Sequence, residues 1–256
     1  RGSEVGTKLL TLTPDNPERG LPVIQGVYVL FGAPGTPGQA PRAVLDGVEL
    51  TGLRTSAVSA LGVRLLADAS PRHLVVFGTG VQAWEHALTF QDVFGLERVS
   101  VVGRDADRAA ALAARIEAEL GVTASTADSE AVAEADVVVT CTAATAPLFD
   151  GTLVPEHATV VAMGSHTTDA RETDDALARR ATVAVESRDS AAREAGDVTL
   201  AVASGALAGI EDTVTLAELV AGTARRREGA PALFVTTGMP WQDLVVASAV
   251  AREVLG

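Results

Sequence analysis

The alternation of hydrophobic and polar positions changes its period near residue 70. Before residue 50, short alternating apolar runs at 8–13, 23–31 and 42–46 are separated by turns rich in Pro, Gly and Asn. Period-two alternation between such turns predicts antiparallel strands. The segment 32–41 is too rich in Gly and Pro for regular structure, and we expect it to form a long hairpin loop.

A helix is predicted over residues 51–69. Thr51 is a capping-type residue, and Ser70-Pro71 ends the helical pattern. This start places Arg54 and Thr55 in the first turn. A guanidinium beside a helix N-terminus can hold a carboxylate or phosphate, because charged donors add to the free N–H groups and the helix dipole. The alternative is that Arg54 pairs with a nearby acid.

From residue 71 onwards, continuous apolar runs alternate with helical patterns. Strands are predicted at 73–77, 99–102, 123–125, 136–141, 159–163, 182–185 and 233–236. Helices are predicted at 84–90, 107–120 and 215–221, from Arg171, and from about Trp241. Alternating strands and helices predict βαβ units and a parallel sheet covered on both faces. The expected class is α/β, a Rossmann-type doubly wound sheet preceded by a smaller, mainly antiparallel β region.

The first of these strands runs into the turn Gly78-x-Gly80-x-x-Ala83. Gly78 permits a sharp turn, and Gly80 lets a pyrophosphate approach the main chain. The helix that follows would direct its N–H groups and dipole at the phosphates, and Val81 and Gln82 of the turn are candidate cofactor-binding residues. Many tight turns need glycine for geometry alone, but the flanking strand and helix favour a dinucleotide site.

The end of the second strand bears on the choice of dinucleotide. An arginine at this point can clasp the 2′-phosphate of NADP, whereas an acid contacts the ribose hydroxyls of NAD. Gly103-Arg104 therefore favours NADP. The competing interpretation has Arg104 as a solvated loop residue and Asp105 as the ribose contact.

Other strand ends supply further candidates. The small-residue turn after Thr142 would let a cofactor lie against backbone, and Met163 ends the next strand. His166, just beyond, is a candidate general acid or substrate ligand, or an ordinary loop histidine. Cys141 is interpreted as a small buried side chain rather than a nucleophile, because no histidine lies near it in sequence.

Composition narrows the class of partner. A formal charge of −13 disfavours nucleic acid and anionic lipid. One cysteine allows no intrachain disulfide, and no apolar run approaches the ~20 residues that span a bilayer, so we expect a cytoplasmic location. The histidines lack metal-ligand spacing, and no metal is expected.

Of the 20 basic residues, 19 are arginine and only Lys8 is lysine. A partly desolvated lysine can release a proton near neutral pH, which arginine cannot. Lys8 is therefore a candidate for chemistry, unless it is simply a remaining surface lysine.

Together these motifs resemble those of the ornithine cyclodeaminase/mu-crystallin family. The similarity rests on residues 6–8, 14–16, 50–60, 164–166, 171–172, 196–197, 237–238 and 242–243, and on the glycine turn followed by His86. It thus extends along essentially the whole chain. Its most specific elements are Arg54-Thr55 and the pattern Gly-x-Gly-x-Gln-Ala-x-x-His.

The resemblance implies a homodimer with a substrate and dimerisation domain at 1–69, completed by 238–256, and a Rossmann domain at 70–237. Lys8 matches the family's active-site lysine and Arg54 its carboxylate-binding arginine, while Thr55 and Gly238 fall at cofactor-binding positions. Family members are usually longer at the N-terminus. We therefore expect strands, and another carboxylate-binding arginine, to precede residue 1.

The leading hypothesis is an NAD(P)-dependent reductase of imines of 2-oxo acids, such as Δ1-pyrroline-2-carboxylate, also able to run as an amino acid dehydrogenase. His166 stands where ornithine cyclodeaminases carry an aspartate that acts in ring closure. That departure places cyclodeaminase activity second. A mu-crystallin-like protein that binds NADP and a ligand is the third hypothesis.

Overall fold

The computed structural model describes residues 4–13, 15–21, 23–33 and 39–255. The chain divides into two compact units, residues 1–55 with 238–256 and residues 56–237. The first boundary falls within helix α1 (Gly47–Leu66), so this helix supplies residues to both units. Within the predicted loop 32–41, residues 34–38 lie outside the described residues.

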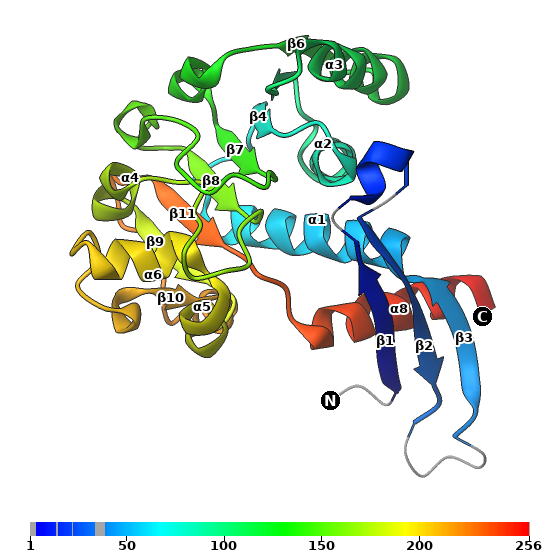
Figure 1. Ribbon diagram of the computed structural model, residues 1–256. Coiled ribbons are helices and arrows are strands. Elements are labelled where there is room, and N and C mark those ends of the chain that lie inside the picture. The colour runs from blue at the N-terminus through cyan, green and yellow to red at the C-terminus, as the bar shows by residue number, and fades with distance from the viewer. Residues whose placement is uncertain (1–3, 14, 22, 34–38, 256) are drawn as a thin grey trace. The chain divides into compact units, whose positions relative to one another are not determined.

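The smaller unit holds a three-stranded antiparallel sheet, as the alternating pattern predicts. Its strands are β1 (Val5–Leu12), β2 (Ile24–Phe31) and β3 (Pro41–Asp46), in the order β1-β2-β3, with the 3-10 turn η1 (Asn16–Arg19) between the first two. Helix α8 (Pro240–Leu255) completes this unit (Figure 1). Tyr28 and Leu30 of the sheet form one apolar core with Leu50, Ala247 and Ala251.

The larger unit contains an eight-stranded sheet whose neighbouring strands all pair in parallel. Its order is β10-β9-β11-β8-β7-β4-β5-β6. The strands are β4 (His73–Phe77), β5 (Arg98–Val102), β6 (Thr123–Thr126), β7 (Val137–Thr140), β8 (Thr159–Ala162), β9 (Thr182–Val185), β10 (Val214–Thr215) and β11 (Ala232–Val235).

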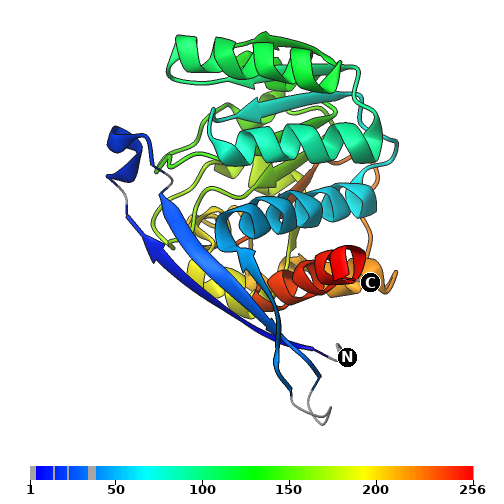
Figure 2. The same cartoon turned by 90° about the vertical axis from the view of Figure 1, so that its right-hand side faces the viewer.

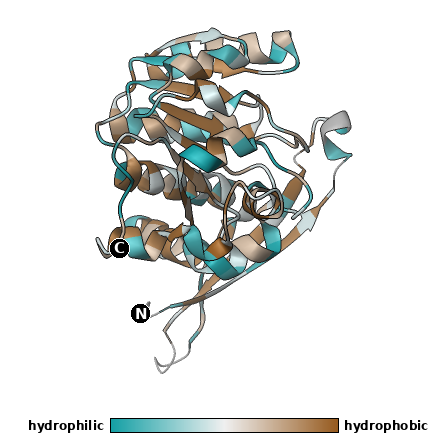
Figure 3. Cartoon of the chain, turned by 90° about the vertical axis from the view of Figure 1, so that its left-hand side faces the viewer, coloured by the Kyte–Doolittle hydropathy of each residue, from teal (hydrophilic) through white to brown (hydrophobic). Residues whose placement is uncertain are grey.

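Helices cover both faces of this sheet, which is why its central strands are apolar throughout (Figures 1 and 2). These helices are the part of α1 from Ser56 onwards, α2 (Val81–Phe94), α3 (Ala106–Leu120), α4 (Asp175–Arg180), α5 (Arg188–Glu194), α6 (Gly196–Ala203) and α7 (Leu216–Val220), with 3-10 turns η2 (Ser129–Glu134), η3 (Gly151–Leu153) and η4 (Ile210–Asp212). In Figure 3 the strands are mostly brown, whereas the helices also carry teal polar positions.

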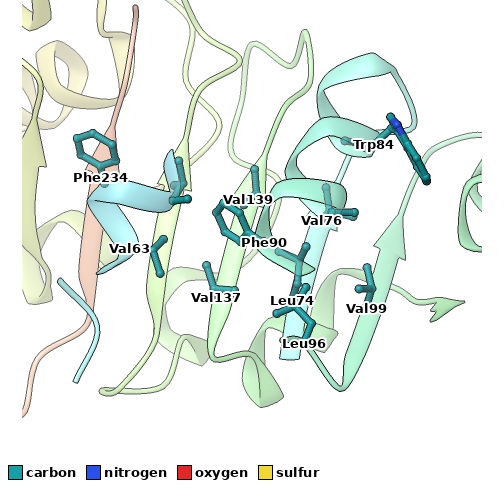
Figure 4. Packing of buried hydrophobic residues seen from close by; sticks show 14 of the residues in the cluster. Val63, Leu74, Val76, Trp84, Phe90, Leu96, Val99, Val137, Val139 and Phe234 are labelled. Carbon is teal, nitrogen blue, oxygen red and sulfur yellow. The ribbon is translucent and has the colours of Figure 1, made fainter. Parts of the chain in front are cut away.

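Two large apolar clusters pack against the sheet of the larger unit, one on each side. Figure 4 shows the first, where Phe90 of α2 packs with Leu74, Val76, Val137 and Val139 of the central strands. The second cluster includes Phe77, Val138 and Val160. The predicted fold class, a Rossmann-type parallel sheet with a small antiparallel β sheet, is confirmed.

Helix α1 begins earlier than its sequence pattern predicts. It starts at Gly47 because the Asp46 carboxylate accepts hydrogen bonds from the N–H groups of Val48 (2.7 Å) and Glu49 (3.2 Å). Arg54 and Thr55 therefore lie two turns into the helix rather than in its first turn. Arg54 does not lie beside the N-terminus of this helix, so its expected first-turn position is wrong.

Candidate functional site

The larger unit has a cavity at the carboxyl ends of β4, β5 and β7. The order of the sheet reverses here, because β4 pairs with β5 on one side and with β7 on the other. A cavity of about 790 Å³ is lined by Phe77, Gly78, Thr79, Gly80, Val102, Gly103, Arg104, Asp105, Arg108, Ser129, Cys141, Thr142, Ala143, Ala144 and Leu148. Ligands of open parallel sheets bind at such reversal points.

The glycine turn is shaped as dinucleotide binding requires. Gly78 has a φ of +121°, and a Cβ there would lie 2.7 Å from the Cys141 carbonyl oxygen, so the fold itself demands glycine. Gly80 is the N-cap of α2, and a Cβ on it would meet no atom of the described residues within 4 Å. The open space beside Gly80 lies at the positive end of α2, where a pyrophosphate fits.

Two arginines line the side of this cavity that follows β5. Arg104 was predicted here, and Arg108 joins it from the first turn of α3. Asp105 is the N-cap of α3 and accepts a hydrogen bond from the Arg108 N–H at 3.0 Å. The four-residue spacing of the two arginines was a signal that sequence analysis did not use, and it also missed Ser129 and Leu148.

The other predicted cofactor residues lie outside this lining. Val81 and Gln82 form the start of α2, and Met163 follows β8 and is buried. Thr55 and Gly238 belong to the smaller unit. There Gly238 lies against the Arg54 guanidinium, since a Cβ on it would come 2.3 Å from an Nη atom.

The smaller unit carries a cluster of charged side chains centred on Asp243, in the first turn of α8. Lys8 Nζ lies 3.1 Å from Asp243 Oδ1 and donates to Thr51 Oγ1 at 2.6 Å. Arg54 Nε lies 3.5 Å from the same Asp243 oxygen, and an Nη group donates to Gln242 Oε1 at 3.3 Å. The cluster thus joins the two predicted residues, Lys8 and Arg54, to an acid.

This cluster has an excess of positive charge. Lys8 and Arg54 are two cations facing one carboxylate, and all three side chains are largely buried. Arg54 Nε has no hydrogen-bond acceptor among the described residues. Burial, followed by the nearby Asp243 carboxylate, raises the pKa of Tyr28, which keeps its phenol protonated. The cluster therefore has hydrogen-bond donors and a net positive charge, both of which favour binding of an anionic ligand.

Sequence analysis quoted Asp243 as part of a motif but gave it no role. Its signal was an acid placed within the first turn of the last helix, a position that favours negative charge. His166 is exposed on the segment after β8. Burial raises the pKa of Cys141, whose Sγ lies 3.1 Å from the Phe77 carbonyl oxygen, so the thiol is no nucleophile at neutral pH.

The described residues offer neither a metal centre nor a membrane-spanning helix. Over the residues that the structure describes, no cluster of three or more His, Cys, Asp or Glu side chains could hold a metal ion. In the same residues, no helix is long and apolar enough to cross a membrane.

Fold and cavity together define a Rossmann-type dinucleotide-binding protein. Over residues 1–256 the chain matches the ornithine cyclodeaminase/mu-crystallin family, and it belongs to that family. It is 34% identical to the Δ1-pyrroline-2-carboxylate reductase of Paracoccus denitrificans, covering 100% of this chain and 81% of that protein. It is also 34% identical to the ketimine reductase mu-crystallin of Mus musculus, over 95% of this chain and 74% of that protein.

Solved structures show the same fold. A Δ1-pyrroline-2-carboxylate reductase of Thermococcus litoralis, in complex with NADH and L-proline, superposes with a TM-score of 0.89 at 26% identity, over 98% of this chain and 78% of that one. An archaeal alanine dehydrogenase dimer with bound NAD superposes with a TM-score of 0.88 at 26% identity, over 99% of this chain and 78% of that one. The family predicted from sequence is thus confirmed, and the relatives support the predicted imine reductase.

Proposed function

We propose that this chain is an NAD(P)-dependent oxidoreductase that reduces imines of 2-oxo acids, cyclic ketimines such as Δ1-pyrroline-2-carboxylate among them. The observation that carries the proposal is the pairing, in one chain, of a dinucleotide cavity with a buried cluster of two cations and one acid. The names of the relatives agree with it.

The chain's own residues supply binding and proton transfer. Arg54 would bind the substrate carboxylate, because its guanidinium is a fork of charged donors whose Nε makes no hydrogen bond, although it lies 3.5 Å from Asp243 Oδ1. Lys8 would give a proton to the imine nitrogen, or bridge to the carboxylate, while Asp243 holds its ammonium in place at 3.1 Å. The chemistry that a dinucleotide would supply when bound is the hydride for reduction of the imine carbon.

We infer that the dinucleotide is NADP rather than NAD. Arg104 and Arg108 both line the cavity after β5, and two guanidiniums suit a 2′-phosphate. Asp105, the rival ribose ligand, already caps α3 through the Arg108 N–H. The solved relatives named above hold NADH or NAD, so the preference for NADP is argued from Arg104 and Arg108 of this chain.

The active form would be a homodimer. The outer face of the small sheet, opposite Tyr28 and Leu30, carries Leu9 paired with Val27, and next to them Val44. Leu9 is 73% exposed and Val44 68% exposed. An apolar sheet face of this kind is typical of a subunit contact, and the alanine dehydrogenase neighbour is a dimer.

The decisive experiment is a substrate panel followed at 340 nm. We expect NADPH oxidation with Δ1-pyrroline-2-carboxylate or a larger cyclic imino acid, or with a 2-oxo acid plus an amine. No oxidation across the panel by protein that binds the dinucleotide would contradict the proposal. Formation of proline and ammonia from ornithine, with no net change of cofactor, would point to the cyclodeaminase instead. Tight dinucleotide binding without turnover would point to a ligand-binding protein.

A further inference from the structure

The buried Glu172 connects two strand ends of the larger unit. Each of its carboxylate oxygens accepts one backbone N–H and one hydroxyl. Oε1 accepts from Thr142 N at 2.8 Å and Thr142 Oγ1 at 2.6 Å, after β7. Oε2 accepts from Gly164 N at 2.8 Å, after β8, and from Thr140 Oγ1 at 2.7 Å. The side chain is fully buried.

The turn that Glu172 holds is part of the dinucleotide cavity. Thr142, Ala144 and Leu148 all line it. The Thr142 hydroxyl donates to Glu172 and accepts from the Ala144 N–H at 3.1 Å, so the carboxylate orients this hydroxyl. The Glu172 carbonyl accepts from the Leu148 N–H at 2.9 Å. One residue therefore supports three positions of the cavity wall.

The other end of the connection leads to His166. Gly164 packs so closely that a Cβ on it would lie 2.1 Å from the Thr142 carbonyl oxygen and 2.6 Å from Glu172 Oε1. The next residue, Ser165, donates to the carbonyl oxygen of Ala170 at 2.5 Å. The segment that carries His166 is thus tied at its start to the cavity turn.

A second buried carboxylate holds Glu172 itself. Asp197 Oδ1 accepts from the N–H groups of Glu172 (3.1 Å) and Thr173 (2.7 Å), and from the Thr173 hydroxyl (2.6 Å). Burial raises the pKa of both carboxyls, and the hydrogen bonds that they accept oppose this rise. Burying a carboxylate costs free energy, and here four accepted hydrogen bonds offset that cost. Both oxygens of Glu172 are therefore fully used in holding the two strand ends.

We propose that Glu172 is a positioning residue for dinucleotide binding, which sets the cavity turn 142–144 and the segment 164–166 relative to each other. The proposal rests on the dinucleotide site of the proposed function. Its chemical requirement is two equivalent acceptors, because the N–H groups of Thr142 and Gly164 can only donate. Glutamine has nearly the same shape but offers one oxygen and one NH₂ group. In Glu172→Gln one of the two backbone N–H groups would therefore face the NH₂ group and lose its acceptor.

The test compares Glu172→Gln with Asp174→Asn, measuring Kd for NADPH and NADH by nucleotide fluorescence. Asp174 is the matched control because each of its oxygens also accepts a backbone N–H, from Leu177 and Gly151, neither of which lines the cavity. We expect Kd to rise about tenfold in Glu172→Gln, because the turn shifts away from the unpaired N–H and must be restored when the dinucleotide binds. We expect Kd to stay within about twofold of wild type in Asp174→Asn, because the N–H group that loses its acceptor, that of Leu177 or Gly151, does not line the cavity.

A second pair covers the case in which Glu172→Gln does not fold. Thr140 donates to Glu172 but does not line the cavity. Thr140→Val should raise the dinucleotide Kd a few-fold, and Thr140→Ser, which keeps the hydroxyl, should restore it. In all these variants the KM for the imine, which depends on the Lys8 and Arg54 cluster, should change much less.

The binding and turnover measurements together distinguish failure of this proposal from failure of the proposed function. If Glu172→Gln is less stable yet binds the dinucleotide like the wild type, or if Thr140→Val matches Thr140→Ser, Glu172 is structural only and the positioning role is overturned. If the wild-type chain binds no dinucleotide, the proposed function fails and this proposal fails with it. Tight binding without imine turnover overturns the reductase and leaves the role of Glu172 standing.

Discussion

Asp243 is the residue at which the two cations of the small unit converge. Sequence analysis singled out Lys8 as the only lysine and Arg54 by its motif, and both lie within 3.5 Å of an Asp243 oxygen. No spacing along the chain could show that Lys8 and Asp243, 235 positions apart, form a pair. The sequence therefore identified Lys8 and Arg54 as candidate residues, but it could not show that both form ion pairs with Asp243.

Replacement of this acid should affect chemistry more than cofactor binding. Asp243→Asn keeps the shape but removes the charge that holds the Lys8 ammonium, so we expect kcat/KM for the imine to fall about 100-fold. The dinucleotide Kd should stay the same, and Glu253→Gln, an exposed site on the same helix, should have no effect. An unchanged kcat/KM in Asp243→Asn would remove Asp243 from the mechanism.

Arg104 should decide the dinucleotide. Arg104→Ser is expected to weaken NADPH binding about tenfold and to leave NADH binding nearly unchanged, because the guanidinium would contact only the 2′-phosphate. Isothermal titration with each nucleotide measures this difference. Arg193→Ser, an exposed site outside the cavity, controls for net charge. Equal loss for both nucleotides would mean that Arg104 binds a part that they share.

Element boundaries depended on single side chains. The hydrophobic pattern located α1, but its start was set by Asp46 rather than Thr51, whose hydroxyl donates instead to the Gly47 carbonyl oxygen at 2.5 Å. Both residues are good caps by type, so propensity alone could not choose between them. The pair Gly196-Asp197, quoted above only for the family resemblance, opens α6 with the Asp197 carboxylate buried.

The cap at Asp46 gives a stability prediction. Asp46→Ala should lower the free energy of unfolding by about 1 kcal/mol, because two N–H groups of the first turn lose their acceptor. Urea denaturation measures the change. Asp46→Asn keeps an acceptor oxygen and should remain close to wild type, whereas a similar loss in both variants would assign the effect to charge.

The contact between α1 and α2 predicts a pH dependence. His86 Nδ1 lies 2.7 Å from the Gln82 carbonyl oxygen, which can only accept, so Nδ1 carries the hydrogen and Nε2 accepts from Ser59 at 2.8 Å. Burial lowers the pKa of His86 to about 4. In the folded state the His86 imidazole therefore stays neutral down to about pH 4. In the unfolded chain it takes up a proton as the pH falls below about 6.5.

His86 should therefore add nothing to the pH dependence above about pH 6.5 and should destabilise the fold progressively down to about pH 4. Between pH 7 and pH 5 its share of the lost stability is about 2 kcal/mol. His86→Gln cannot titrate, and its urea unfolding free energy should fall by that much less over the same interval. Parallel pH profiles for the two proteins would contradict a buried neutral imidazole.

At the scale of the whole molecule, the outer face of the small sheet predicts assembly. If Leu9 and Val44 lie in a dimer contact, Leu9→Glu with Val44→Glu should convert dimer to monomer in sedimentation velocity runs, because charges would be buried in an apolar interface. Val220→Glu, an equally exposed apolar site on α7, should leave the dimer intact. A wild-type chain that is monomeric at micromolar concentration would contradict the homodimer.

By itself, the sequence determined the fold class, the family and the residue types of both sites. Those properties are local: apolar periodicity, a glycine turn after a strand, and one lysine among arginines. The domain limits at 69/70 and 237/238 and the cytoplasmic location remain predictions. Tertiary structure alone decided that Asp243 pairs with Lys8, that Arg108 joins Arg104, and that Glu172 spans two strand ends. Hydrogen bonds and ion pairs act over about 3 Å in space, and only the folded chain brings such distant residues within that range.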